Sequence, residues 1–276
     1  MSARSAHIDE RAARRAFERA GRHYEAASRL EAEVGARLRE RLDYIKIEPK
    51  RILDAGSGPG REARALAARY RGAHVVALDY ALAMLPRRGV LQRLVGKGTL
   101  AVCADMTRLP LQSESVGLAW CNMALHWLND PLAAFREFER VLAPGGLFMF
   151  STLGPDTLKE LRAAAGEARV HAFADMHDLG DMLVATGLTN PVMEMELLTV
   201  DYTGSGQLIA DLRASGQTNA RADRRRGLSP RAFGERLRAA LDAAPRMTYE
   251  VVYGHAWKQA QPPSAVKTVR VFKRIS

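Results

Sequence analysis

Short apolar runs alternate with amphipathic segments between residues 51 and 152, and this rhythm predicts strands that alternate with helices. Five runs predict strands: RILDAG at 51–56, HVVALD at 74–79, LAVCAD at 100–105, VGLAWCN at 116–122 and LFMFST at 147–152. Helices are predicted at 61–70, from residue 81 to a limit at Pro86, and at 131–142. The alternation predicts a parallel sheet with right-handed crossovers, and the nearly continuous apolar runs indicate that both faces are buried.

The pattern changes on both sides of this region. Residues 8–42 carry apolar residues at helical spacing and predict one or two amphipathic helices, and residues 175–188 predict another that ends at Gly187. Residues 193–203 and 248–258 alternate as antiparallel strands do. We therefore predict a helical cap at 1–48, an α/β domain at 49–258 with a helical lid at 204–246, and a basic tail at 259–276.

Composition narrows the class of protein only slightly. A hydrophobic fraction of 47% in 276 residues is enough for a sizeable core, and a formal charge of +10 indicates an acidic partner. Cys103 and Cys121 lie outside any metal-binding spacing, so we expect no metal and two buried, reduced thiols. No run is long and apolar enough to span a membrane, and no secretory leader is evident, so a cytoplasmic protein is expected.

The stretch LDAGSGPG at 53–60 follows the first predicted strand and precedes a helix. Glycines let a backbone approach a ligand closely, and a helix start presents free N–H groups, so this arrangement predicts an anion or nucleotide site. Gly56, Gly58 and Gly60 do not fit the dinucleotide fingerprint, because Arg61 stands where its third glycine belongs. The loop also lacks the Gly-Lys-Ser/Thr of a P-loop, and a tight turn without a ligand remains the alternative.

Two acidic residues favour a ligand over a simple turn. Asp79 ends the second strand, where a carboxylate can accept hydrogen bonds from ribose hydroxyls, and Asp105 ends the third. Either acid alone could be a solvated turn residue. Together with the glycine loop they fall at the carboxyl ends of neighbouring strands, which is the usual ligand crevice of an open α/β sheet.

DAGSGPG, LDY and CADMTRLPL resemble the class I S-adenosylmethionine-dependent methyltransferases over residues 51–152. The resemblance implies a Rossmann-like seven-stranded sheet with an antiparallel edge hairpin. It also implies that the glycine loop faces the methionine part of the cofactor, the second-strand acid holds the ribose and the third-strand acid faces adenine. The cofactor-binding residues implied are Asp54, Gly56, Gly58, Gly60, Asp79, Tyr80, Asp105 and Met106.

Motifs outside the glycine loop bear on the methyl acceptor. They are RAFERAGRHYEAAS (15–28), NMALHW (122–127), STLGPDTLKELR (151–162), FADMHDLGDML (173–183), ARADRRRGLS (220–229) and TYEVVYGHAWK (248–258). Together they resemble the biotin-pathway malonyl-acyl-carrier-protein O-methyltransferases. This implies methylation of the free carboxyl of a malonyl thioester on acyl carrier protein. Parts of them also resemble respiratory-complex assembly proteins with a methyltransferase fold, and carboxyl methyltransferases of the trans-aconitate type, which remain alternatives.

A carboxylate methyl acceptor determines which groups the protein needs for the reaction. A carboxyl group is ionised at neutral pH and is already a nucleophile, so positioning and exclusion of water matter more than a base. Tyr24 could hydrogen-bond a carboxylate or pack in the core. Asn122 and His126 are expected near the transferred methyl, and His126 stands where family members can carry glutamine, so it is expected to donate a hydrogen bond.

Arginines are expected to hold the acceptor. Residues 211–246 contain nine arginines and four acids, and a basic lid would steer an acidic acyl carrier protein. Arg224 and Arg226 occupy positions at which the resembled family also has arginine, so the resemblance implies a substrate-binding role for both. A nucleic-acid substrate is not expected, because 122–127 lacks the Asp/Asn-Pro-Pro-aromatic motif and no RNA-binding module is evident.

Overall fold

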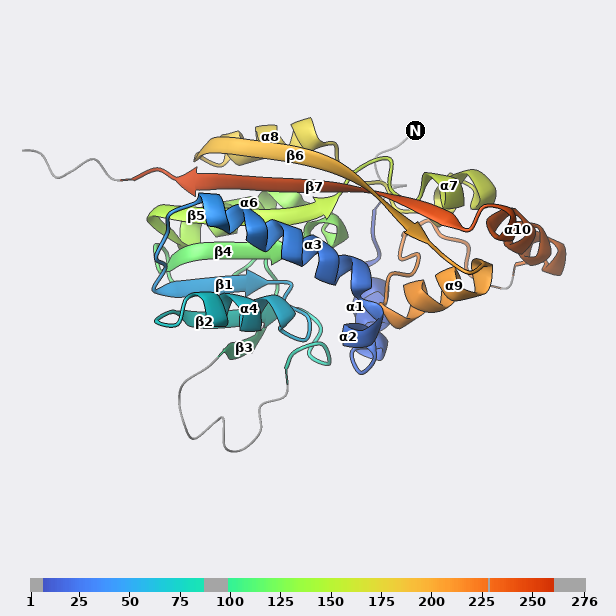
Figure 1. Cartoon of the computed structure of the whole chain (residues 1–276), viewed down its shortest axis with the longest axis horizontal. Helices are drawn as coiled ribbons and strands as arrows, with labels where there is room; N and C mark the ends of the chain where they lie inside the picture. The colour runs from blue at the N-terminus through green and yellow to red at the C-terminus, as the bar shows by residue number, and fades with distance from the viewer. Residues whose placement is uncertain (1–6, 87–98, 228, 261–276) are drawn as a thin grey trace, which may run out of the picture.

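A computed structural model describes residues 7–86, 99–227 and 229–260 as an α/β fold built on one seven-stranded sheet (Figure 1). The strands lie in the order β3-β2-β1-β4-β5-β7-β6, with β7 antiparallel to both of its neighbours. Their bounds are β1 Arg51–Ala55, β2 His74–Asp79, β3 Leu100–Cys103, β4 Val116–Asn122, β5 Leu142–Leu153, β6 Leu188–Asp201 and β7 Arg246–Lys258. The predicted fold class, including the antiparallel edge hairpin, is confirmed.

Helices cover both faces of the sheet and gather at one end of it. They are α1 Glu10–Ala20, α2 Tyr24–Ala27, α3 Arg29–Glu40, η2 Arg41–Tyr44, α4 Arg61–Arg69, η3 Leu125–Trp127, α6 Pro131–Val141, α7 Lys159–Ala165, η4 Glu167–Arg169, α8 Met176–Ala185, α9 Ser205–Ala214 and α10 Arg231–Ala243. In Figure 1, α7, α9 and α10 lie at the end where β6 and β7 extend beyond the parallel strands. The carboxyl ends of β1 and β4 point toward this end as well.

Alternate side chains of the central strands pack into two separate hydrophobic cores, one on each face of the sheet. Leu53, Ala119 and Phe148 face α6 and α8, whereas their neighbours Ile52 and Leu118 face α3 and α4. This follows from the two-residue period of a strand, which sends successive side chains to opposite faces. Because both faces are covered, the strand sequences show no polar alternation, as predicted.

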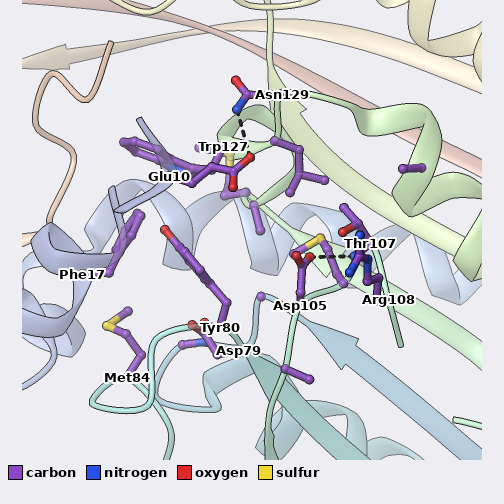
Figure 2. Close-up of a pocket in the computed structure, with 18 of the residues that line it drawn as sticks. Glu10, Phe17, Asp79, Tyr80, Met84, Asp105, Thr107, Arg108, Trp127 and Asn129 are labelled. Carbon is purple, nitrogen blue, oxygen red and sulfur yellow. Dashed lines mark hydrogen bonds between the residues drawn. The ribbon is translucent and has the colours of Figure 1, made fainter. Parts of the chain in front are cut away.

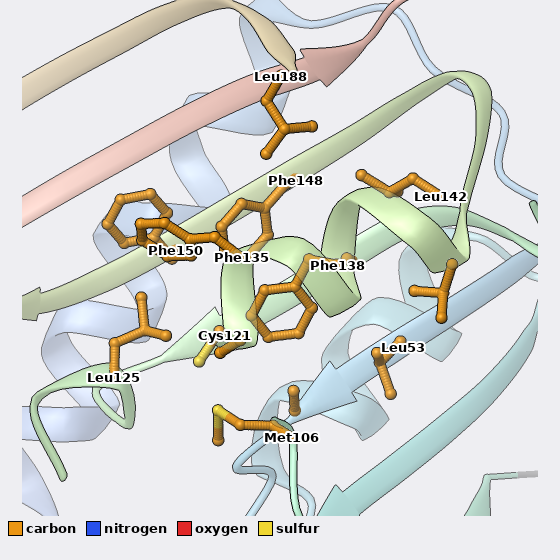
Figure 3. Close-up of a cluster of buried hydrophobic side chains, with 14 of the residues drawn as sticks. Leu53, Met106, Cys121, Leu125, Phe135, Phe138, Leu142, Phe148, Phe150 and Leu188 are labelled. Atoms are coloured by element: carbon orange, nitrogen blue, oxygen red, sulfur yellow. The ribbon is translucent and has the colours of Figure 1, made fainter. Parts of the chain in front are cut away.

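Aromatic rings fill the core on the α6 side (Figure 3). Phe138 stacks on Phe148 with ring centroids 4.5 Å apart, and Phe148 stacks on Phe150 at 5.1 Å. Phe135 packs edge-on against Phe148 at 5.6 Å. Helix α6 turns both of its rings toward the sheet because Phe135 and Phe138 lie three positions apart, on one face of the helix. Asp130 caps its first turn, accepting a hydrogen bond from the Ala133 N–H.

Three local predictions are corrected. Residues 81–86 form turns instead of the start of a helix, because the Asp79 carboxylate binds the Ala81 N–H and turns the chain; the rest of that predicted helix lies outside the described residues. Strand β5 begins at Leu142 instead of 147, with a register irregularity opposite Val116. Cys103 is exposed, because β3 is an edge strand, whereas Cys121 is buried as expected.

The N-terminal segment is tied to the insertion between β6 and β7. Ile8 forms a β-bridge with Arg221, and the Asp9 N–H donates to the Ala220 carbonyl at 2.7 Å. Asn129 joins the same segment, because it both accepts from the Ile8 N–H and donates to the Ile8 carbonyl. The predicted cap and lid therefore touch each other across the carboxyl end of the sheet. The predicted tail lies outside the described residues from 261 onward.

Within the described ranges 7–86, 99–227 and 229–260, no helix has the length and apolar character needed to cross a membrane. No cluster of three or more His, Cys, Asp or Glu side chains suited to a metal ion occurs in those ranges either.

Candidate active site

The glycine loop is held against the end of β2 by its own backbone. The N–H groups of Gly56 and Ser57 both donate to the Leu78 carbonyl, at 2.8 and 2.9 Å. Gly56 and Gly58 have φ of +72° and +53°, in the left-handed region that favours glycine. The chain can therefore turn sharply between β1 and α4 while its backbone stays at the edge of a cavity.

Asp79 connects this loop to the following turn. Its carboxylate accepts from the Gly58 N–H at 3.0 Å and from the Ala81 N–H at 2.8 Å. Burial raises the pKa of this carboxyl to about 6, against the lowering effect of those backbone hydrogen bonds. Each carboxylate oxygen accepts one of these bonds and retains capacity for a further donor.

A cavity of about 340 Å³ lies at the carboxyl ends of β1, β2 and β4 (Figure 2), a size within the range of small-molecule sites. It brings together eight of the residues that the sequence predicted, namely Tyr24, Gly56, Gly58, Asp79, Tyr80, Asp105, Met106 and Asn122. We call it the cofactor cavity. Gly60 does not line it; this residue precedes α4 as its N-cap, in a left-handed conformation with φ of +79°.

Asp105 and Met106 form one side of the cofactor cavity. The Asp105 carboxylate is exposed and accepts from the Thr107 N–H at 2.8 Å, which fixes the turn after β3. Met106 is 8% exposed and packs in the core next to Asp105. A carboxylate beside an apolar surface is a suitable environment for a flat ring that carries an amino group.

Aromatic rings form the opposite side. Phe17 of α1 packs edge-on against Tyr24, Tyr80 and Trp127, with centroid distances of 6.4, 6.3 and 4.9 Å. All four rings line the cofactor cavity. Figure 2 shows Phe17 and Tyr80 on the side of the cavity away from Asp105. Aromatic faces attract a cation, so this wall is suited to a ligand with a positive centre.

Asp54 lies beside the cofactor cavity instead of in it. It lines a small adjoining cavity together with Gly56, Gly58 and Asn122. Burial, with the nearby Glu62 as a second cause, raises the pKa of the Asp54 carboxyl well above its usual range. Its Oδ2 atom is buried and has no hydrogen-bond partner among the described residues.

Both polar atoms of the Asn122 side-chain amide are hydrogen-bonded. Its Nδ2 group donates to the Glu31 carbonyl at 2.9 Å, and its Oδ1 accepts from the Ser151 hydroxyl at 2.7 Å. This fixes the end of β4 against α3. The structure therefore gives Asn122 a positioning contact at the cavity in which sequence analysis expected it.

His126 lies outside the cofactor cavity. It lines two other cavities, and its Nδ1 is 3.5 Å from the Thr152 hydroxyl. Burial, with His171 as a second cause, lowers the pKa of His126 to about 3, so the imidazole is neutral at neutral pH. Its Nε2 is buried without a partner among the described residues.

The two predicted substrate arginines also lie outside the cofactor cavity. Arg224 donates to the Asp9 carboxylate at 3.0 Å and to the Arg221 carbonyl at 2.7 Å, which ties the lid to the N-terminal segment. Arg226 is exposed and makes no hydrogen bond or ion pair with any described residue. The geometry therefore gives Arg224 a structural contact and leaves Arg226 available at the surface.

Glu31 is a site residue that sequence analysis missed. It lies on α3 and is 7% exposed, and its carboxylate accepts a hydrogen bond from the Gln217 side chain of the lid. It lines the small cavity together with Tyr24 and Asn122. Glu31 occupies an ordinary charged position in an amphipathic sequence, and only the contact with Gln217, 186 residues away, distinguishes it.

The Glu31 carboxyl should make stability depend on pH. Burial raises its pKa to about 7 from a usual value of 4.5, despite the hydrogen bond from Gln217. Between these values the folded protein retains a proton that the unfolded chain has lost, so stability falls as pH rises through this window. We expect the free energy of unfolding of the wild-type protein to fall by roughly 3 kcal/mol between pH 5 and pH 8 because of this group. In Glu31→Gln this part of the fall should be absent, as measured by the free energy of unfolding at the two pH values.

The control for this measurement is Glu33→Gln, because Glu33 is 55% exposed on the same helix. It should leave the pH dependence of the wild-type protein unchanged. Parallel stability curves for Glu31→Gln and the wild-type protein would show that Glu31 does not carry the effect.

The residues of the site suit S-adenosylmethionine. A Cβ at Gly58 would point toward Tyr24 and Met84 at 3.5 Å, so the missing side chain opens the cavity at the loop. Asp79 offers carboxylate oxygens suited to hydroxyl donors, and the orphaned Asp54 Oδ2 lies near the same loop. The aromatic wall suits a sulfonium.

Comparisons with solved structures agree with this fold. The chain matches YcgJ from Bacillus subtilis with a TM-score of 0.57 at 16% identity, over 81% of this chain and 98% of that one. It matches Haemonchus contortus phosphoethanolamine N-methyltransferase 2, in complex with S-adenosyl-L-methionine, with a TM-score of 0.50 at 18% identity, over 82% and 52%. A family model described as a methyltransferase domain matches residues 53–150. Fold and site together define a class I S-adenosylmethionine-dependent methyltransferase.

Curated relatives give the family. A malonyl-[acyl-carrier protein] O-methyltransferase from a Methylovorus species is 47% identical over 94% of this chain and 92% of that protein. A protein of the same name from Gallionella capsiferriformans is 48% identical over 92% of each. The chain belongs to the family of malonyl-[acyl-carrier protein] O-methyltransferases.

Proposed function

We propose that this protein transfers a methyl group from S-adenosylmethionine to the free carboxyl of a malonyl thioester on acyl carrier protein. In this proposal the product is the methyl ester that starts biotin synthesis. The observation that carries the proposal is the cofactor cavity, which Asp79, Asp105 and four aromatic rings line together, in a chain 47% identical to a relative of that name.

The described residues have the properties that such a reaction requires. S-adenosylmethionine supplies a methyl group on a positively charged sulfur. Asp79 and Asp105 are proposed to hold its ribose and adenine, while the glycine loop and Asp54 lie at its methionine end. The aromatic wall excludes water, which strengthens the attraction between a carboxylate and a cation. A neutral His126 with a pKa of about 3 is a poor proton acceptor, which is consistent with a carboxylate nucleophile that needs no base.

The cap and lid are proposed to recognise the acceptor. Tyr24 lies at the junction of the cofactor cavity and the small cavity, where its hydroxyl can reach a carboxylate. Burial raises the pKa of Tyr24 well above its usual value, so the hydroxyl stays protonated and can donate. Arg226 is proposed to attract an acidic carrier protein from the surface of the lid, and Arg224 to hold that lid against Asp9.

Mass spectrometry of malonyl-acyl carrier protein tests this function. Incubation with the protein and S-adenosylmethionine is expected to add one methyl group, in an amount that grows with time and requires both components. Free malonate should be methylated far more slowly. An unchanged carrier-protein mass under conditions in which the protein binds S-adenosylhomocysteine would exclude the proposed acceptor.

A further inference from the structure

A second cavity of about 320 Å³ lies on the far side of Trp127 from the cofactor cavity. It is bounded by η3, by the end of β5, by α7, by η4 and the segment after it, by α9 and by the loop after α9. Its apolar lining consists mainly of Leu153, Leu158, Leu161, Phe173, Ile209 and Leu212. The cavity therefore opens among the helices that gather at the carboxyl end of the sheet in Figure 1.

Two contacts join this cavity to the methyl-transfer site. Trp127 lines both it and the cofactor cavity, with one ring contact to Phe17 and another to His171, each at 4.9 Å. Gln217 lines the second cavity and donates to Glu31, which lines the small cavity beside the glycine loop. Trp127 is thus the lining residue that the two cavities share in the described part of the chain, and a ligand that extends past its ring would enter both.

The two large cavities carry opposite charge. Among described residues, the cofactor cavity is lined by four acids, Glu10, Asp79, Asp105 and Asp130, and by one arginine, Arg108. The lining of the second cavity has no acidic residue in the described part of the chain. Its charged side chains there are Arg169 and Arg213, because burial lowers the pKa of His171 to about 4 and of His126 to about 3.

The two arginines are placed differently. Arg169 lies with its guanidinium 4.7 Å from the Phe233 ring centroid and donates to the Ser229 hydroxyl at 3.1 Å. Arg213 is exposed on the last turn of α9, and its guanidinium makes no hydrogen bond or ion pair with a described residue. An unpaired arginine at the edge of an apolar cavity is suited to a phosphate or carboxylate group.

We propose that the second cavity binds the phosphopantetheine arm of the acyl carrier protein, with Arg213 and Arg169 holding its phosphodiester. This inference rests on the proposed function. The arm is an uncharged chain of methylenes and amides between a thioester and one anionic group, which matches an apolar cavity with cations at its edge. The thioester end would pass Trp127, so that the malonyl carboxylate enters the cofactor cavity while the carrier protein stays outside.

Three variants test the assignment. Arg213→Glu reverses the charge at the exposed edge and changes no described contact. Ile209→Trp fills the apolar part of the cavity. Arg71→Glu is the matched control, because Arg71 is exposed in the turn before β2, at the opposite edge of the sheet from the site. Each is assayed with malonyl-acyl carrier protein and with the malonyl thioester of N-acetylcysteamine, which lacks the phosphate.

We expect Arg213→Glu to raise KM for the carrier-bound substrate at least tenfold with little change in kcat. The same variant should leave KM for the small thioester within twofold, and Arg71→Glu should change neither. Ile209→Trp should lower kcat/KM at least tenfold for both substrates while affinity for S-adenosylhomocysteine stays within twofold. Equal kinetics of Arg213→Glu and Arg71→Glu with the carrier substrate would overturn the phosphate assignment, whether or not Ile209→Trp folds.

Binding of 4′-phosphopantetheine alone, measured by calorimetry, separates this inference from the proposed function. Saturable binding that Arg213→Glu weakens would support the second cavity even if no methyl ester forms. The wild-type protein could instead methylate malonyl-acyl carrier protein without binding 4′-phosphopantetheine, and Ile209→Trp could leave that activity intact. These two results together would show that the arm binds elsewhere.

Discussion

Asp79→Ala should weaken binding of S-adenosylhomocysteine roughly 100-fold, because it removes two kinds of contact at once. The carboxylate is the proposed acceptor for the ribose hydroxyls, and it also accepts from the Gly58 and Ala81 N–H groups. Alanine would leave both buried donors unpaired, at a cost of about 1–3 kcal/mol each. Calorimetric titration with S-adenosylhomocysteine measures the affinity, and thermal unfolding without ligand measures the cost to stability.

Two companion variants separate these contributions. Asp79→Asn keeps one carbonyl acceptor, so it should recover part of the stability but less of the affinity. Asp105→Ala should weaken binding only about tenfold with little loss of stability, because Asp105 is exposed and accepts only from the Thr107 N–H. An Asp79→Ala protein that binds within threefold of the wild type would show that the cofactor lies elsewhere.

Gly56→Ala should also have a large effect, through the backbone. The residue has φ of +72°, and an added Cβ would overlap the Cβ of Ala124, a side chain that cannot rotate away. The loop and the end of β4 would have to separate, which displaces Gly58 and Asn122 from the cofactor cavity. We expect a loss of roughly 2–4 kcal/mol of stability together with at least a tenfold loss of S-adenosylhomocysteine affinity.

Gly145→Ala is the control for this change. Gly145 has nearly the same φ, +76°, but an added Cβ there meets nothing within 4 Å. Only the cost of the left-handed conformation remains, about 1 kcal/mol, and affinity should not change. If Gly56→Ala and Gly145→Ala lower the stability equally, the added Cβ at position 56 must avoid Ala124 without a displacement of the loop.

The sheet could be predicted from the sequence because its signals are local. Strand β2 was predicted with its exact ends from six residues, and β4 from seven, since an unbroken apolar run directly reports burial on both faces. The glycine loop and Asp79 could be paired as a site because consecutive parallel strands end at the same edge of a sheet. Such signals say nothing of a strand's place in the sheet, which is why the exposure of Cys103 on edge strand β3 was not foreseen.

The contacts that close the site could not be predicted, because they join residues far apart in the chain. Asn129 binds the backbone of Ile8 across 121 positions, and Glu31 accepts from Gln217 across 186. Arg224 was assigned to a substrate by resemblance, and no property of its neighbours in sequence indicates that Asp9 pairs with it. Pairing of this kind depends on how the cap and lid fold back over the sheet.

The opposite charge of the two large cavities has a consequence for inhibitor design. A single compound that occupies both cavities would need a positive centre at the nucleoside end in the cofactor cavity and an anionic group at the end in the second cavity. The linker between the two ends would pass the edge of the Trp127 indole. A nucleoside analogue without the anionic arm would occupy only the cofactor cavity. Selectivity for this enzyme would therefore come from the arm that reaches Arg169 and Arg213.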